Sequence, residues 1–369
     1  MSAVSPGLPS RRELTAPFLN AAKTPLEVRV DLGGCVIAVR TGDDALAKEL
    51  THYFQEFLSP GGESEIVITA LESAPVTLDL PYAAKAPDPG KTKIKEEFCE
   101  LADGRVVRKR LTGMVFIFGG GDNLVLGPCR ENANQVVNFV NNRFIERMLN
   151  QGCQLGHAAG VRLCGRGLAL AGFSGMGKST LAMRLMSLGA DFVSNDRILA
   201  SRGAGGVCMR GVPKQPRVNP GTLLNNEDLA WIIDPEKRRE LLALPADSLW
   251  RLEQKYDALI VDSFGPGKFV LTARMNGLVI LNWRRDGGPV LVRAVSLSER
   301  PELLAAFMKS TGLFYRAEGP GVGFDRSPAA YAALLSAADV IEIAGGVDFD
   351  RAAAVCRDYL ETGRISAGG

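Results

Sequence analysis

Residues 167–180 read GLALAGFSGMGKST, an apolar run followed by a segment rich in glycine and hydroxyl side chains. The first five residues are typical of a buried strand. From Gly172 onward the sequence matches G-x-x-x-x-G-K-[ST] in full, and the apolar spacing of residues 178–189 predicts a helix directly after it. A strand that enters such a loop and a helix that leaves it are the context of a phosphate-binding P-loop, and they indicate an α/β fold.

The loop residues have the properties that phosphate binding requires. Its glycines permit positive φ angles and a close approach of the main chain to phosphates, while backbone N–H groups and the helix N-terminus supply partial positive charge. We expect Lys178 to contact the β- and γ-phosphates of ATP and Ser179 to bind Mg²⁺. The predicted nucleotide-binding residues are Gly172, Ser174, Gly175, Met176, Gly177, Lys178, Ser179 and Thr180. The alternative is a glycine-rich helix cap with a solvated lysine.

A short apolar strand, DFVS (191–194), is followed by Asn195 and Asp196. The carboxyl end of a strand beside a P-loop is where a magnesium-binding carboxylate belongs. Asp196 can therefore hold Mg²⁺, directly or through water, or accept a proton from a hydroxyl. Asn195 cannot ionise, but its amide can orient a hydroxyl or a metal-bound water. The alternative is a simple turn, which both residue types favour.

Two further side chains are candidates for catalysis. His157 lies just before the strands that lead to the P-loop, although a lone histidine is often structural. Arg210 lies in MRGVPKQPRVNPGT (209–222), a segment that also carries Lys214 and Arg217 among prolines and glycines. This segment is either a rigid basic loop that clamps phosphate and stabilises transition-state charge, or a solvated loop.

Composition limits the class of protein and its environment. The 369 residues are 46% apolar and 23% charged, which is ordinary for a globular protein of two domains. A net charge of +2 argues against nucleic-acid or membrane partners held by bulk electrostatics, and no apolar run approaches the roughly 18 residues of a membrane span. The start of the chain has no apolar core of signal-peptide length. Seven scattered cysteines without a C-x-x-C pair favour reduced thiols in the cytoplasm.

The chain divides into three predicted regions. Residues 1–25 are polar and are expected to form a flexible N-terminal tail. Residues 26–150 alternate strand patterns with two helical stretches, which predicts a smaller α+β domain. Residues 151–369 contain the P-loop pattern and are expected to form the second, α/β domain.

These residues resemble the HPr kinase/phosphorylase family, whose kinase domain is similar to PEP carboxykinase. In that family a catalytic histidine precedes a strand hairpin, then G-x-S-G-x-G-K-S, a helix, a short strand and an Asp-Asp pair. Here His157, the loop GFSGMGKS and the pair Asn195–Asp196 occupy these places, and Arg210–Gly211 looks similar to the family's Arg-Gly pair. The sequence segments SNDR and PRVNPGT look closest to those of the group called HPr kinase-related kinase B. The resemblance covers residues 153–222 strongly and is not evident in 1–150.

The resemblance implies an ATP- and Mg²⁺-dependent kinase that transfers the γ-phosphate to a hydroxyl of a protein Ser/Thr or a small-molecule alcohol. It implies catalytic places for Asp196, His157, Asn195 and Arg210, and metal binding by Ser179 and Asp196. The first domain would position the substrate or mediate assembly, for instance into a homo-oligomer. Two alternatives stay open: a nucleotide-gated binding module that has lost transfer activity, because Asn195 replaces an acidic residue, and a simple NTPase.

Overall fold

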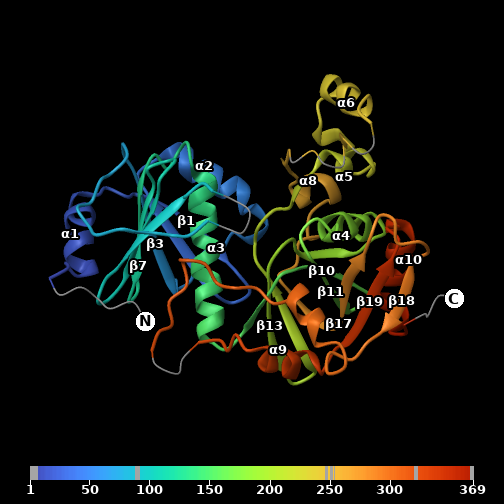
Figure 1. Cartoon of the computed structure of the whole chain (residues 1–369). Coiled ribbons are helices and arrows are strands. Elements are labelled where there is room, and N and C mark those ends of the chain that lie inside the picture. The colour runs from blue at the N-terminus through green and yellow to red at the C-terminus, as the bar shows by residue number, and fades with distance from the viewer. Residues whose placement is uncertain are drawn as a thin grey trace. The chain divides into compact units, whose positions relative to one another are not determined.

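The chain forms two compact units, each of mixed α/β structure. The computed structural model describes residues 7–87, 92–245, 248–249, 252, 254–319 and 323–365 (Figure 1). The first unit comprises Met1–Arg147 and Thr311–Val322, and the second comprises Met148–Ser310 and Gly323–Gly369. The α/β class expected from the sequence is therefore observed. The return of residues 311–322 to the first unit was not anticipated, because hydrophobic periodicity carries no information about which unit a connecting segment joins.

The first unit is built on a sheet with strand order β1-β2-β3-β8-β7-β6-β5-β4, in which β2, β3 and β8 run parallel and the other neighbours are antiparallel. Its strands are β1 (Leu26–Asp31), β2 (Val36–Thr41), β3 (Ile66–Glu72), β4 (Ala83–Ala84), β5 (Glu96–Glu100), β6 (Arg105–Lys109), β7 (Val115–Gly119) and β8 (Asp122–Gly127). Its helices are α1 (Arg11–Ala21), α2 (Asp44–Tyr53), the 3-10 turn η1 (Gln55–Phe57) and α3 (Ala133–Asn150), whose last residues lie in the second unit.

Residues 1–25 were expected to form a flexible tail, and in the described part of this segment that prediction is wrong. Residues Arg11–Ala21 form helix α1 instead. Ser10 caps this helix: its hydroxyl accepts from the Glu13 amide at 3.2 Å, and the Glu13 carboxylate accepts from the Ser10 amide at 2.6 Å. Arg11 is 5% exposed and forms ion pairs with Asp103 and Asp122. The helix is thus fixed by charges about a hundred residues away, which the polar composition of the segment could not reveal.

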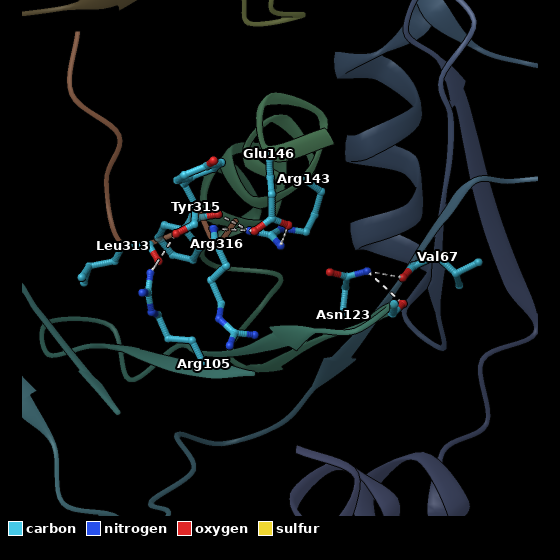
Figure 2. A network of polar contacts seen from close by, with 10 residues as sticks. Val67, Arg105, Asn123, Arg143, Glu146, Leu313, Tyr315 and Arg316 are labelled. Atoms are coloured by element: carbon cyan, nitrogen blue, oxygen red, sulfur yellow. Dashed lines mark hydrogen bonds and ion pairs between the residues drawn. The ribbon is translucent and has the colours of Figure 1, made fainter. Parts of the chain in front are cut away.

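A network of polar groups holds the segment Leu313–Arg316 in the first unit (Figure 2). Arg143 of α3 donates to the Phe314 carbonyl, and Arg105 of β6 donates to the carbonyls of Leu313 and of Tyr315. Glu146 pairs with Arg143 and also accepts from the Arg316 amide at 2.9 Å. Most of these contacts are made to main-chain atoms of the segment, so they fix the path of its backbone and place little requirement on its side chains.

The Phe314 ring anchors the same segment. It lies 5.3 to 5.8 Å, centroid to centroid, from the rings of Phe116, Phe118 and Phe139. The Arg143 guanidinium lies 4.1 Å from the Phe118 centroid, which is a cation–π distance. Burial lowers the pKa of Arg143 to about 10 and raises the pKa of Glu146. This ion pair is therefore kept charged by mutual contact, against the cost of its desolvation.

The second unit contains a nine-stranded sheet with the path β12-β10-β11-β17-β14-β13-β9, to which β19 and β18 are added beside β17. Its strands are β9 (Gln154–Gly156), β10 (Ala158–Leu163), β11 (Arg166–Gly172), β12 (Asp191–Ser194), β13 (Ile198–Gly203), β14 (Gly206–Gly211), β17 (Thr272–Trp283), β18 (Leu291–Ala294) and β19 (Asp339–Gly345), and β15 (Arg217–Val218) and β16 (Tyr256–Asp257) pair separately. Its helices are α4 (Lys178–Ser187), α5 (Pro220–Leu224), α6 (Pro235–Leu242), α8 (Ile260–Phe264), α9 (Pro328–Leu335) and α10 (Phe349–Thr362), with 3-10 turns η2 (Ala230–Ile232) and η3 (Pro301–Ala306).

Strand β17 is the centre of this sheet. It pairs in parallel with β11 on one side, and on the other side its first residues pair with β14 and its later residues with β19. Helices α4 and α10 pack against each other and against β10 and β11 (Figure 1). The apolar run GLALA is fully buried in β11, as the sequence predicts, and this burial fixes where the chain leaves the sheet at Gly172.

None of the helices in the described ranges is both long enough and apolar enough to cross a membrane. All seven cysteines are free thiols, and five of them are buried. Burial raises the pKa of Cys129 and of Cys356 to about 12, so these thiols are unreactive.

We predict that Arg143→Met destabilises the first unit by about 3–5 kcal/mol, because it leaves Glu146 without its buried counter-charge. Arg147→Ala is the matched control on the same helix. Its ion pair with Glu65 is about two-fifths exposed, so its loss should cost about 1 kcal/mol or less. Native-state hydrogen exchange of α3 and β7 measures both, and equal effects of the two substitutions would contradict the role assigned to Arg143.

Candidate functional site

Residues Gly172–Gly177, here called the glycine loop, join β11 to α4. Gly177 is the N-cap residue of α4 in the left-handed conformation, with φ of 83° and no side-chain hydrogen bond at the cap. A Cβ atom at this position would lie 2.4 Å from the Phe349 ring. Only glycine satisfies both requirements, so the helix begins with its first amide groups uncovered by any capping side chain.

Two contacts brace the glycine loop and its helix. The Trp283 indole at the end of β17 donates to the Met176 carbonyl at 3.1 Å, and its ring packs edge-on against Phe349 at 5.0 Å. The hydroxyls of Thr180 and Thr222 lie 2.8 Å apart, which ties α4 to α5. The loop is therefore held in shape by the end of the central strand, without any ligand.

Lys178 turns its side chain back over the glycine loop. Its ammonium donates to the carbonyls of Gly172 at 2.8 Å and of Phe173 at 3.3 Å. Burial lowers the pKa of Lys178 to about 8, helped by the charge of Lys309 and opposed by that of Asp196. Within the described part of the chain, nothing hydrogen-bonds to the half-buried Ser179 hydroxyl. The loop thus offers a cation, a free hydroxyl and a helix N-terminus side by side.

Asp196 follows β12 and is the centre of a second group of contacts. His157 Nε2 lies 3.2 Å from its Oδ1 atom, and Lys309 Nζ lies 3.4 Å from its Oδ2 atom. Arg197 Nε is 3.8 Å from the same Oδ2 atom. The Asp196 side chain keeps 45% of its surface exposed, so it stays accessible to a substrate.

The pairing of β9 explains why these distant residues meet. Gly156 is the register partner of Ile198 in β13, and it also forms an isolated bridge with Met308. Chain segments around 157, 197 and 309 therefore run side by side. The His157 amide donates to the Phe307 carbonyl at 2.6 Å, and a Cβ at Gly156 would lie 2.3 Å from the Phe307 ring. This close packing leaves room only for glycine beside His157.

The electrostatics of Asp196 follow from these contacts. Burial alone raises the pKa of this carboxyl, but the hydrogen bond from His157 and the charges of Lys309 and Arg197 outweigh burial. The pKa of Asp196 is held well below its usual range. The carboxylate is therefore ionised at neutral pH and is a weak proton acceptor until some of the surrounding positive charge is neutralised.

The amide of Asn195 is partly buried. Its Oδ1 atom is buried and has no hydrogen-bond partner among the described residues. The turn it occupies is held by the Ser194 hydroxyl, which donates to the Arg197 carbonyl at 2.5 Å and accepts from the Val212 amide at 3.4 Å. A buried acceptor without a partner is costly, and it marks a place where a ligand donor would fit.

Within the described residues, Arg210 contacts no member of this group. Its Nη1 atom lies 3.8 Å from the Met148 sulfur, and its buried Nε atom has no partner within the described part of the chain. Position 210 points to one face of β14 and the buried positions 209 and 211 to the other. A transition-state role for Arg210 stays a prediction without a contact that supports it.

Lys309 was missed by the sequence analysis. It lies in a segment whose spacing suggests an ordinary helix, more than a hundred residues from Asp196. The structure replaces most of that helix by the short turn η3, after which Lys309 bonds through its amide to the Leu155 carbonyl at 3.2 Å. No local pattern could have identified it.

A cavity of about 610 Å³ lies elsewhere in the second unit. Its wall includes Cys164 and Gly165, which precede β11, whereas the glycine loop follows β11. None of the predicted site residues lines this cavity. Titratable groups converge at the glycine loop and Asp196, which makes these residues, and not this cavity, the candidate site.

The donor set fits magnesium only with a nucleotide present. Within the described ranges, no group of three or more His, Cys, Asp or Glu side chains could hold a metal ion. Mg²⁺ commonly takes one or two protein ligands and completes its shell with phosphate oxygens and water. The Ser179 hydroxyl and the accessible Asp196 carboxylate meet that requirement, although Lys309 and Arg197 already compete for the carboxylate.

Comparisons with known proteins give little further support. No protein-family model matches the chain, and no curated protein matches it. Among solved structures, the Hpr(Ser) kinase/phosphatase from Coxiella burnetii is similar over 56% of this chain and 90% of its own length. The sequence identity is 12% and the TM-score is 0.29, which does not establish a shared fold. The resemblance to HPr kinases thus stays a prediction from the residues.

We predict that Mg·ATP affinity falls as pH rises above about 8, because Lys178 must be protonated to contact phosphate and its pKa in the free protein is about 8. The loss should approach tenfold per pH unit until the raised pKa of the complex is reached. Calorimetry from pH 7 to 9.5 measures it, with Lys178→Arg as a control whose charge is constant. A flat profile for the parent protein would count against the contact.

The same shift has the opposite effect on the free protein. Between pH 8 and 10.5 the unfolded lysine holds its proton while the folded one loses it, so the contribution of Lys178 to stability rises with pH. Thermal unfolding without nucleotide should show this rise, and Lys178→Arg should remove it.

Proposed function

We propose that this protein is an ATP- and Mg²⁺-dependent kinase that transfers the γ-phosphate to a hydroxyl group. One observation carries the proposal: the phosphate-type loop with Lys178 and the carboxylate–histidine pair Asp196–His157 lie in one electrostatically coupled site. A helix cap needs neither the buried lysine nor the nearby carboxylate. A simple turn at Asn195–Asp196 needs neither His157 nor Lys309.

In this proposal the glycine loop and the N-terminus of α4 bind the phosphate tail. The uncovered amides at Gly177 and the ammonium of Lys178 are suited to a polyanion. Mg²⁺ would be held by the Ser179 hydroxyl and by Asp196, directly or through water. When bound, the ion neutralises charge on the β- and γ-phosphates.

Asp196 orients the attacking hydroxyl and accepts its proton. His157 donates to the Oδ1 atom and so fixes the rotamer of the carboxylate, which leaves Oδ2 facing Lys309 and Arg197. Phosphoryl transfer passes through a loose transition state, in which the hydroxyl loses its proton late. A weak base is therefore sufficient, and positioning contributes most of the rate.

The second candidate is a nucleotide-gated switch without transfer chemistry. The observation that favours it is Asn195, which supplies an amide where a second carboxylate would strengthen metal binding. The two functions differ in whether label from ATP ever reaches an acceptor. Incubation of the protein with γ-labelled ATP and a metabolite or lysate fraction separates them, and it also distinguishes a simple NTPase, which releases the label as phosphate.

We predict that Asp196→Asn lowers single-turnover transfer by about 10²–10⁴ while Mg·ATP still binds, because the loop contacts are unchanged and a positioned base is lost. Asp191→Asn is the matched control, at the start of the strand that precedes Asp196: its carboxylate pairs with Arg162 and Lys268. Equal transfer rates in the parent and Asp196→Asn proteins would remove Asp196 from the mechanism.

We predict that His157→Ala lowers turnover, with nucleotide affinity and thermal stability nearly unchanged, because the imidazole acts only on the orientation and charge of Asp196. The other histidine, His52, lies on α2 of the first unit, so His52→Ala should leave turnover unaffected. The histidine is structural if His157→Ala instead lowers the melting temperature by several degrees and the variant regains normal turnover under conditions that stabilise its fold.

A further inference from the structure

The site around Asp196 holds more positive charge than the nucleotide alone explains. Lys309 and Arg197 contact the carboxylate, and the charges of Lys178 and Lys214 also interact with it. Nearby, Arg217 and Asp257 neutralise each other in an ion pair at 2.9 Å. Four cations thus surround one carboxylate. Mg²⁺ would neutralise part of the phosphate charge of a bound nucleotide, which leaves positive charge uncompensated on the acceptor side.

Lys214 is held near Asp196 and Asp257 by charge alone, without a direct bond to either carboxylate within the described residues. Its side chain is half-buried and makes no hydrogen bond or ion pair with any residue in the described ranges. Burial, followed by the like charge of Arg197, lowers the pKa of Lys214. The charges of Asp196 and Asp257 offset only part of the cost of burying this ammonium, and a bound anion would offset more of it.

The loop that carries Lys214 is fixed in place. The Val212 amide donates to the Ser194 hydroxyl, which belongs to the turn of Asp196. The buried Gln215 side chain accepts from the Ile260 amide at 3.0 Å, and Pro213 and Pro216 on either side of these residues are buried. Lys214 therefore differs from a mobile surface lysine, because its backbone is held beside the reacting carboxylate.

A second observation points to a ligand at the same turn. The Oδ1 atom of Asn195 is buried without a partner among the described residues. An amide oxygen accepts a hydroxyl proton but repels an anion, so it suits the uncharged part of the acceptor. The site thus presents an acceptor group for a hydroxyl and an unpaired cation for an anion on the same ligand.

We propose that the phosphate acceptor is a hydroxyl compound that carries a carboxylate or a phosphate group, and that Lys214 binds this anion. The proposal rests on the proposed kinase function and specifies its substrate class. A neutral alcohol would leave Lys214 unpaired, and a cationic acceptor would add to the repulsion around Arg197.

The first arm of the test measures nucleotide binding. Mg²⁺ and a non-hydrolysable ATP analogue are titrated calorimetrically into the parent, Lys214→Gln, Lys214→Arg and Lys237→Gln proteins. Lys237 is the control, because it lies on α6 in an exposed ion pair with Glu240. We expect binding in all four. Its absence from all four would count against the kinase, and with it against an acceptor site.

The second arm measures the anion site with the nucleotide site saturated. Inorganic phosphate or acetate is added in the millimolar range, and the shift of the melting temperature gives the apparent affinity. We expect one or both anions to stabilise the parent and Lys237→Gln proteins. Lys214→Gln should weaken the affinity by about tenfold or more, and Lys214→Arg should retain it. The anion with the larger effect shows whether the acceptor group is a phosphate or a carboxylate.

Two results would overturn the inference while leaving the kinase intact. One is normal nucleotide binding with no specific stabilisation of the parent protein by either anion. The other is equal stabilisation of the parent and Lys214→Gln proteins, which would mean that the anions act by general salt effects.

Discussion

The carboxylate of Asp196 is the group on which the candidate site depends. It is held by His157 from the β9–β10 connection, by Arg197 of its own turn and by Lys309 from the segment after η3. These contacts come from parts of the chain that meet only through the register of β9 with β13 and the bridge to Met308. A shift of one residue in that pairing would turn His157 to the other face of the sheet and remove its contact with Asp196.

The sequence predicts the local part of this arrangement well. The strand–loop–helix around Gly172, the burial of GLALA and the strand that ends before Asn195 all follow from apolar spacing and glycine placement, and the structure has β11, α4 and β12 there. These features depend on neighbouring residues only. The partnership of His157 with Asp196 depends on strand pairing, and the sequence could suggest it only through resemblance to a family.

The features that the sequence did not predict have a common physical origin. Lys309, helix α1 and the return of residues 311–322 to the first unit are all fixed by long-range contacts between charged or aromatic groups. Arg11 and Arg143 are almost fully buried although they are charged: Arg11 pairs with Asp122 of another element, and Arg143 pairs with Glu146 of its own helix and donates to the Phe314 carbonyl. Pattern analysis treats such residues as solvated, and for this reason it assigned the segment of Arg11 to a flexible tail.

The charges of the site also couple its two halves. In the free protein, the hydrogen bond from His157 and the charges of Lys309 and Arg197 hold the pKa of Asp196 far below its usual range, and burial lowers the pKa of Lys178 to about 8. Phosphates bound at the glycine loop would favour the charged form of Lys178 and would partly neutralise the field of Lys309. Both changes follow from the negative charge that the nucleotide adds. Weakening the field of Lys309 raises the pKa of Asp196. In the proposed reaction, a directly bound Mg²⁺ would lower the pKa of the carboxylate, whereas an ion held through water leaves the negative charge of Mg·ATP to raise it. With the ion held through water, the carboxylate becomes a better proton acceptor only after the nucleotide has bound, and an acceptor that arrives first meets a weaker base. The cations that surround Asp196 thus favour an order in which the nucleotide precedes the acceptor, without any movement of the chain.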